Sequence, residues 1–253
     1  MDVAAALGLL ALAGAVGVYG TIIGAGGGFV LIPALVLIFD LEGVEAVGTG
    51  MVTLAVIGST GAIAYNRAGL VDRQVAAWFA LGGVPAAMLL AWLLADRINA
   101  DWFIALLGFL LLALAVFVVV VPTPSGADGS PEPPKRARLF FMGSAIGSLS
   151  GLFAVGGGLI TVPTLSRMQK LSAHRATATT SATSMAGSIA GSVGHSLAGN
   201  VQWDKAGILM VGAFVGSSVG ARMAGRLSSQ TVLVLLACGL VTAGVPLVVE
   251  ALR

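Results

Sequence analysis

Two clusters of consecutive glycines are the part of this sequence whose residue type and spacing most directly indicate chemistry. Each cluster stands immediately before a short apolar segment, and the members are Gly26, Gly27 and Gly28 in the first cluster and Gly156, Gly157 and Gly158 in the second. Glycine lets the backbone leave helical geometry and lets a ligand approach it closely. A helix that begins after such a break directs N–H groups and the positive end of its dipole at the gap. Two such helix ends could bind a small anion, although the same glycines could instead serve only a tight hairpin tip or a close helix crossing.

Hydroxyl side chains in two otherwise apolar segments are a second set of candidates. Thr49 lies in one segment, and Thr179 and Ser181 lie in the other. Hydroxyl groups can donate hydrogen bonds to the oxygens of an anion and remain tolerable inside a membrane. We expect these three side chains to line an anion pathway. The alternative is that they bond to the preceding helical turn or to a neighbouring helix.

A histidine and a tyrosine are candidates for moving a proton. His195 and Tyr65 occupy corresponding positions near the ends of two apolar segments. Histidine changes charge close to neutral pH, so His195 could carry a proton that is coupled to transport. The alternative is a purely interfacial residue. The expected partners are therefore a small anion, a coupling proton and the lipid bilayer.

Signals for other kinds of chemistry are missing from the sequence. The only histidines are His174 and His195, and no H-E-x-x-H motif occurs. Phe29 stands where a dinucleotide-binding G-x-G-x-x-G motif would place its last glycine, and there is no Walker A motif. A net charge of +2 gives no indication of nucleic-acid binding. We therefore expect neither an enzyme, nor a metal site, nor a cofactor, nor a nucleic-acid partner.

The composition indicates where these residues are placed. Hydrophobic residues make up 57% of the 253 residues and charged residues only 9%, against about 25% charged in an ordinary soluble domain. Lipid requires no polar cover, whereas water does. The composition predicts an all-α integral membrane protein.

The chain repeats itself at a constant offset of 130 residues, the separation of Gly26 and Gly156. Pro33 then corresponds to Pro163, and Thr49 to Thr179. A register that stays ungapped over so many positions indicates a duplicated structural unit. We predict an N-terminal transmembrane repeat at 1–121, a cytoplasmic linker at 122–138 and a C-terminal transmembrane repeat at 139–253.

Segment lengths and charges predict how the repeats are inserted. The segments at 26–39 and 157–168 are short: about 14 residues reach about 21 Å at 1.5 Å per residue, less than the hydrocarbon core of about 30 Å. Each repeat is thus expected to hold a glycine-broken helical hairpin plus three transmembrane helices. That odd number of crossings gives two inverted-topology repeats. Placing the basic linker inside, as the positive-inside rule requires, puts both termini outside a multi-pass protein of the cell inner (cytoplasmic) membrane.

Several of these residues carry a resemblance to a known family. The hairpin sequences GAGGGFVLIPAL and AVGGGLITVPTL, the run ATATTS at 176–181 and the turn at 198–203 resemble the TauE/SafE sulfite exporter family. The resemblance covers nearly the whole chain except the linker. It implies a secondary carrier for sulfite, sulfonates or related sulfur-containing anions, with export usually inferred. The first half departs from the second at Gly50 and Tyr65, so the two halves of the site need not contribute equally.

The residues and the resemblance together predict a secondary transporter. The expected cargo is a small sulfur-containing anion such as sulfite, a sulfonate or sulfoacetate, and the expected direction is export. Alternating access would take place around a central site between the two broken-helix hairpins. A passive anion channel is the alternative, because the same residues would serve it.

Overall fold

The apolar segments form helices in the computed structural model, which describes residues 2–24, 26–93, 97, 100–120, 135–155, 158–223 and 229–252. Within these residues there are helices and no strands. The helices are α1 (Val3–Ile23), α2 (Gly28–Leu37), α3 (Gly43–Arg67), α4 (Arg73–Leu93), α5 (Ala100–Val120), α6 (Arg136–Phe153), α7 (Gly158–Met168), α8 (Ala173–Leu197), α9 (Trp203–Met223) and α10 (Ser229–Ala251). The all-α prediction is confirmed. Residues 122–134 of the expected linker lie outside the described residues, and α6 already begins at Arg136, inside the range expected for the linker.

Corresponding helices of the two halves end in the same way, as the repeat predicts. After α3 the chain turns at Gly69 with a φ of 70°, and after α8 it turns at Gly199 with a φ of 83°. Leu70 N–H donates to the Tyr65 carbonyl at 3.1 Å, and Asn200 N–H donates to the His195 carbonyl at 2.9 Å. A glycine with positive φ satisfies the last carbonyls of a helix in this manner.

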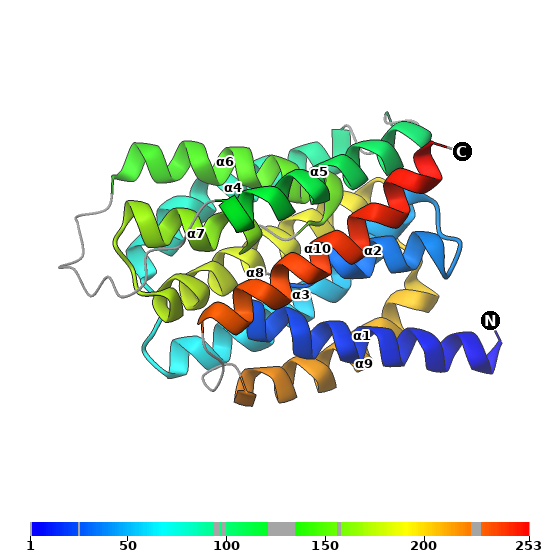
Figure 1. The fold of residues 1–253 in the computed structure, drawn as a ribbon, viewed down its shortest axis with the longest axis horizontal. Helices are drawn as coiled ribbons and strands as arrows, with labels where there is room; N and C mark the ends of the chain where they lie inside the picture. The colour runs from blue at the N-terminus through cyan, green and yellow to red at the C-terminus, as the bar shows by residue number, and fades with distance from the viewer. Residues whose placement is uncertain are drawn as a thin grey trace.

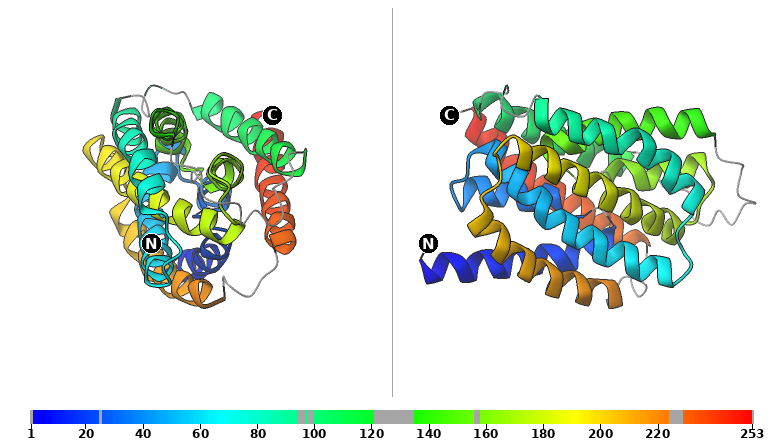
Figure 2. Two further views of the ribbon diagram at one scale, coloured as in Figure 1. Left: turned by 90° about the vertical axis from the view of Figure 1, so that its left-hand side faces the viewer. Right: turned by 180° about the vertical axis from the view of Figure 1, so that it is seen from behind.

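The two halves are interlocked rather than side by side. α3 and α8 pack against each other, and each also packs against a helix of the other half, α9 and α4 respectively. Around this pair, α1 packs on α9, α6 on α4 and α10 on α5, so every outer pair takes one helix from each half (Figures 1 and 2). The central helix α3 is therefore mostly buried.

Corresponding helices run in opposite directions along the bundle. In Figure 1, α3 runs from right to left and α8 from left to right, and the right-hand panel of Figure 2 shows the same from behind. α1 begins and α10 ends at the same end of the bundle (Figure 1).

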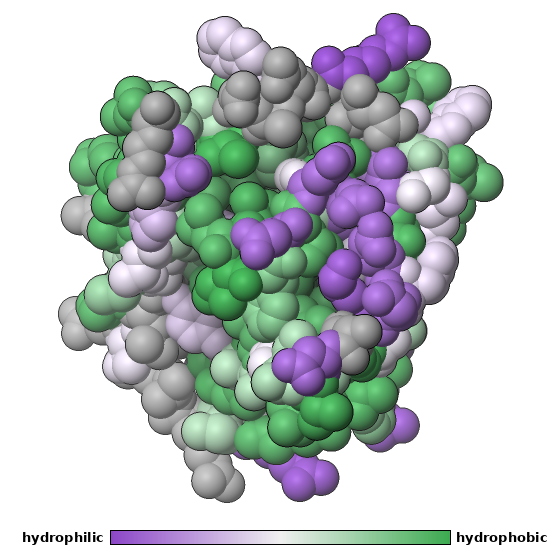
Figure 3. Space-filling view, turned by 90° about the vertical axis from the view of Figure 1, so that its right-hand side faces the viewer, coloured by the Kyte–Doolittle hydropathy of each residue, from purple (hydrophilic) through white to green (hydrophobic). Residues whose placement is uncertain are grey.

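Charged residues divide between the two ends of the bundle. The left-hand end of Figure 1 carries basic residues at helix ends and turns, namely Arg67, Arg73, Arg136, Arg167, Lys170, Arg175 and Arg222. The opposite end carries Asp2, Asp40, Glu42, Glu45 and Asp204. Asp72, Arg97 and Lys205 are exceptions to this division. Figure 3 looks onto the second end and shows hydrophilic residues gathered over part of it, with hydrophobic residues around them.

The sides of the bundle suit a lipid environment. Large apolar side chains stand outward on several helices, and Leu81, Phe109 and Phe214 are each more than half exposed. By length and composition, four of the described helices could cross a membrane: α1, α3, α4 and α9. The described apolar stretches in α2, α5 and α10 are shorter. The long arm of the first hairpin, α1, is thus itself long enough to cross, whereas its short arm α2 is not.

Glycines bring the outer pairs into backbone contact. On α9, a side chain at Gly212 or Gly216 would meet the carbonyl oxygen of Leu10 or Gly14 of α1, at 2.4 and 2.0 Å from its Cβ. On α6, a Cβ at Gly143 would lie 2.0 Å from the Phe79 carbonyl oxygen of α4. Small residues allow helices in membranes to approach this closely. These stripes hold the two halves together.

Candidate functional site

The first break lies between α1 and α2 and depends on glycine. Gly24, Gly26 and Gly27 have φ values of 72°, 77° and 81°, a region that side chains other than glycine rarely adopt. α1 ends at Ile23 and α2 begins at Gly28. Gly26 and Gly27 of the predicted cluster therefore adopt non-helical geometry, whereas Gly28 is already the first residue of α2.

The second break lies between α6 and α7. Gly156 and Gly157 are outside the described residues, and α7 begins at Gly158. Before them, Ala154 ends α6 with a φ of 49°, the position that Gly24 occupies in the first half. An alanine in this conformation is strained. The repeat register could have identified Ala154, but a motif search for glycine passes over it.

The two breaks meet in the interior of the bundle. A Cβ added to Gly28 would lie 1.8 Å from the carbonyl oxygen of Ala154 and 2.8 Å from a side-chain carbon of Leu54 on α3. The start of α2 thus touches the end of α6, and only glycine fits at this contact. The structure brings together, from opposite halves, two segments that the sequence places far apart.

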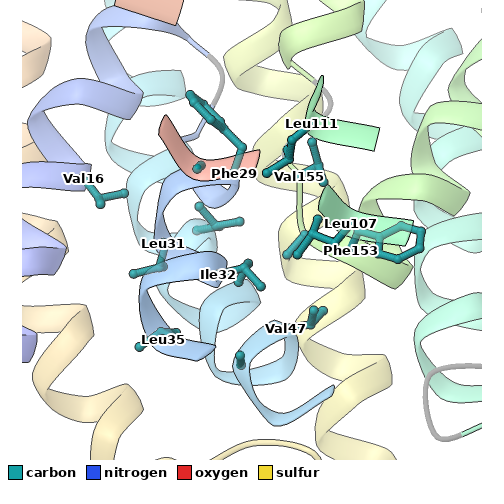
Figure 4. Close-up of a cluster of buried hydrophobic side chains, with 14 of the residues drawn as sticks. Val16, Phe29, Leu31, Ile32, Leu35, Val47, Leu107, Leu111, Phe153 and Val155 are labelled. Carbon is teal, nitrogen blue, oxygen red and sulfur yellow. The ribbon is translucent and has the colours of Figure 1, made fainter. Parts of the chain in front are cut away.

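An apolar wall surrounds this meeting point. Figure 4 shows Phe29, Leu31 and Ile32 of α2 in one buried apolar cluster with Leu107, Leu111, Phe153 and Val155, and Ile32 lies on the side of α2 nearer to that group. The side chains of Phe29, Leu31 and Ile32 are fully buried. A low-dielectric wall of this kind strengthens any hydrogen bond from a backbone N–H group to an anion held at the breaks.

Thr49 and Thr179 are fully buried and form equivalent contacts between the halves. The Thr49 hydroxyl accepts a hydrogen bond from Gln202 N–H at 3.0 Å, and the Thr179 hydroxyl accepts one from Asp72 N–H at 3.0 Å. Asp72 and Gln202 precede α4 and α9, so each threonine receives an N–H group near the first turn of a helix from the opposite half.

Side chains reinforce both threonine contacts. Gln202 Nε2 donates to Glu45 Oε1 at 2.6 Å, and Arg175 Nη2 lies 3.9 Å from Asp72 Oδ2. One contact lies at each end of the bundle, because the α8–α9 and α3–α4 turns are at opposite ends (Figure 1). The structure therefore does not bring Thr49 and Thr179 to one point. Sequence reasoning missed Asp72 and Gln202, although both are polar and correspond to each other in the repeat.

Ser181 lies nearer to the first break. Its hydroxyl donates to the Thr177 carbonyl at 3.0 Å. Thr177 in turn packs on Gly24, where an added Cβ would lie 2.2 Å from Thr177 Cγ2. A Cβ at Gly61 would lie 3.6 Å from Thr21 and 3.8 Å from Ser181, so α1, α3 and α8 meet here. Of the predicted hydroxyl residues, Ser181 is the one that the structure places beside a break.

Tyr65 and His195 make equivalent hydrogen bonds to the helices that lead into the breaks. The Tyr65 hydroxyl donates to the Thr21 carbonyl at 3.3 Å, and His195 Nε2 lies 2.9 Å from the Gly151 carbonyl. A carbonyl only accepts, so His195 Nε2 carries the hydrogen of this bond. Both carbonyls belong to the last turn before a break, and the Thr21 carbonyl also accepts a hydrogen bond from Gly24 N–H at 3.3 Å. The two side chains therefore stabilise the last turns of α1 and α6.

Removing the donor at His195 is expected to destabilise the protein. His195→Phe leaves the buried Gly151 carbonyl unpaired, at a cost of about 1–3 kcal/mol. The melting temperature in detergent should fall, and Tyr65→Phe is the matched control at the corresponding position, with a smaller fall because its bond is longer. His195→Gln keeps an N–H donor and removes the titratable group. If transport by His195→Gln keeps its full dependence on a proton gradient, His195 does not carry the coupling proton.

Within the described residues, no three His, Cys, Asp or Glu side chains gather into a group that could hold a metal ion. The buried polar side chains in this part of the chain are hydroxyls, one glutamine and His195, with no Lys, Arg, Asp or Glu among them. Two breaks that meet inside a helical bundle, with neutral donors around them, are features of a membrane transporter.

Comparison with known proteins supports this class. The model of the family described as "Sulfite exporter TauE/SafE" matches residues 9–247. The chain belongs to this family, and it is a multi-pass membrane transporter.

Its relatives are likewise named as probable membrane transporter proteins. The probable membrane transporter protein YunE of Bacillus subtilis is 27% identical over 97% of this chain and 96% of its own length. The probable membrane transporter protein ORF9 of a Sinorhizobium species is 28% identical over 80% and 77% of the two chains. A third, MJ0441 of Methanocaldococcus jannaschii, is 26% identical over 64% and 62%. No solved structure matches this chain.

Proposed function

We propose that this transporter is a secondary carrier that exports small sulfur-containing anions, such as sulfite, sulfonates or sulfoacetate, across the cytoplasmic membrane. The anion would bind at a central site between the two broken-helix hairpins. Alternating access around that site would expose it first to one side of the membrane and then to the other. The family description supports the sulfur-containing cargo.

The observation that carries this proposal is the contact between the two breaks. The start of α2 at Gly28 touches the end of α6 at Ala154, inside an apolar wall. Breaking two helices inside a membrane is unfavourable unless the freed backbone groups have partners. An anion is the partner that the N-terminal ends of α2 and α7 would favour, because both N–H groups and helix dipoles attract negative charge.

An inverted arrangement of the repeats is the second part of the proposal. The opposite directions of α3 and α8 and the common end of α1 and α10 support it (Figure 1). The basic end of the bundle would face the cytoplasm by the positive-inside rule, which puts both termini outside. Because α1 packs on α9 and α6 on α4, the units that move against each other would each combine helices of both halves.

Transport by the purified protein in liposomes tests the proposal. Vesicles loaded with unlabelled sulfite should accumulate labelled sulfite by counterflow, with a rate that saturates as the concentration rises. Sulfoacetate and short alkanesulfonates should compete, and chloride should compete poorly. Protein that moves none of these anions in either direction would rule the proposal out. Large unitary currents without counterflow would show a passive channel instead of a carrier.

A further inference from the structure

Five polar side chains of the α7–α8 hairpin have buried polar atoms that find no hydrogen-bond partner among the described residues, namely Thr161, Ser166, Gln169, Thr180 and Ser184. Thr161, Gln169 and Thr180 are at most 1% exposed, and neither their hydroxyl groups nor the amide of Gln169 forms a hydrogen bond within the part of the chain that the structure describes. The Ser184 hydroxyl is buried and unpartnered as well. A buried polar group without a partner costs about 1–3 kcal/mol. Five of them along one helical hairpin call for an explanation.

The spacing of these residues places them on facing surfaces. Thr161 and Leu165 share one face of α7, and Gln169 follows at the same spacing just past the end of the helix, where its N–H group still donates to the Leu165 carbonyl at 3.0 Å. Ala176, Thr180 and Ser184 share one face of α8 in the same way. α7 and α8 pack against each other, and Leu165 and Ala176 belong to one core cluster, which supports an arrangement with these two faces directed at each other.

The antiparallel hairpin then sets the register of the two helices. An antiparallel register that pairs Leu165 with Ala176 also pairs Thr161 with Thr180, one turn closer to the second break. A further turn brings the chain to Ser184 and to the break itself. We name Thr161, Gln169, Thr180 and Ser184 the polar track. It leads from the turn between α7 and α8 to the second break.

The track ends at a small cavity. Ser184, Thr183 and Ser150 contribute to its lining, together with Gly83 of α4 and Gly147 of α6, and its volume is about 20 Å³. A space of this size holds a water molecule. Hydroxyl groups next to it provide the polar partners that a bound water requires.

The first half has no such track. The residues that correspond to the polar track are Leu31, Phe39, Gly50 and Leu54. Leu31 and Leu54 are buried in the main apolar cluster. A side-chain carbon of Ile32 fills the space beside Gly50, since an added Cβ would lie 2.3 Å from it. The strip that corresponds to the track is therefore dry and closely packed.

The charges at the two hairpin turns also distinguish the two halves, and they too favour an anion on the side of the polar track. The turn at the start of the polar track carries Arg167, Lys170 and Arg175, and the corresponding turn in the first half carries Asp40 and Glu45. Clusters of one sign raise the local concentration of ions of the other sign. An anion is attracted at the mouth of the track and repelled at the mouth of the dry strip.

We propose that the polar track is a hydrated passage by which a small anion reaches the second break from the basic end of the bundle. Its neutral donors replace part of the hydration shell of the anion as it enters. The dry strip in the first half closes the opposite route in this conformation. The role of the track as a route for cargo rests on the proposed transport function, but its hydration and its preference for anions do not.

Thiol labelling tests the passage without any transport assay. Thr161→Cys is placed in a Cys238→Ala background, which removes the only native cysteine, and Leu31→Cys in the same background is the matched control. The protein is reconstituted in vesicles with known orientation, and the reagents are added on the side that the basic end faces. One methanethiosulfonate reagent is anionic and the other is cationic. Each rate of cysteine modification is divided by the rate at which the same reagent modifies a free thiol in solution. Thr161→Cys should react, about tenfold faster with the anionic reagent, and Leu31→Cys should stay unmodified. Equal labelling of the two variants, or a preference for the cationic reagent, overturns the proposal.

A second pair of measurements separates the passage from a structural role. Gln169→Leu removes polar atoms that have no partner, so its melting temperature should equal or exceed that of the unaltered protein. Its sulfite counterflow should nevertheless fall at least severalfold. A lowered melting temperature with unchanged counterflow would show that Gln169 only supports the fold. If the unaltered protein moves no anion but the labelling pattern holds, the transport function is wrong and the hydrated passage stands.

Discussion

Replacing Gly28 by alanine is expected to cause a larger loss of stability and of transport than the same change at any other glycine that the structure describes. The new Cβ would lie 1.8 Å from the Ala154 carbonyl oxygen, and this obstacle is backbone that no side-chain rotation can remove. A side-chain carbon of Leu54 would lie 2.8 Å from the same Cβ and obstructs it as well. The start of α2 and the end of α6 must therefore separate. We expect a cost of about 3 kcal/mol, the upper end of the range for overpacking a core.

The Gly28→Ala experiment has a clean control in the same chain. At Gly207 of α9 an added Cβ meets nothing within 4 Å. Gly207→Ala should therefore leave the melting temperature unchanged or raise it slightly, because alanine favours a helix more than glycine does. Gly28→Ala should melt well below it and show no counterflow in liposomes. A Gly28→Ala protein that matches Gly207→Ala in both assays would mean that the two breaks do not touch.

Gly216→Ala is expected to have the second largest effect, through the packing of α9 on α1. Its Cβ would lie 2.0 Å from the Gly14 carbonyl oxygen and 2.7 Å from the carbonyl carbon. The two helices, which come from opposite halves, would have to move apart along their whole contact. Overpacking of this kind costs about 1–3 kcal/mol. Since α1 leads into the first break, we also expect slower transport.

Gly216→Ala is measured against the same Gly207→Ala control, which lies on the same helix. Thermal unfolding in detergent and counterflow in liposomes are followed for both variants. Unfolding of Gly216→Ala at the temperature of the control would contradict the close contact of α1 and α9. A normal melting temperature with slowed counterflow would show instead that this contact matters only while the carrier changes conformation.

The sequence predicted the features of the fold that depend on local residue types. The glycine clusters marked where α1 and α2 separate, because positive φ values at Gly24, Gly26 and Gly27 require glycine. Segment lengths predicted the short helices α2 and α7, because an apolar run and the residues that bound it are local properties of the sequence. The repeat register gave corresponding turns at Gly69 and Gly199.

Features that depend on contacts between distant segments could not be predicted in this way. The hydroxyl groups of Thr49 and Thr179 accept hydrogen bonds from the N–H groups of Gln202 and Asp72, partners that the sequence did not indicate, and their place in an anion pathway stays a prediction. A sequence gives no distance between residues so far apart. The pairing of α1 with α9 and of α4 with α6 was likewise unpredictable, since it depends on how the halves interlock. Ala154 escaped notice because its strained backbone is held by surrounding structure, not by its residue type.

Locating a bound anion in a crystal shows whether an anion binds where the two breaks meet. Selenite has the shape and charge of sulfite, and its selenium atom scatters X-rays anomalously. In crystals grown with selenite, we predict one strong anomalous peak between the first residues of α2 and α7, within hydrogen-bonding distance of backbone N–H groups at Gly28 and Gly158. Unlabelled sulfite should displace it. A selenium peak elsewhere in the bundle, or none at saturating selenite, would contradict this account.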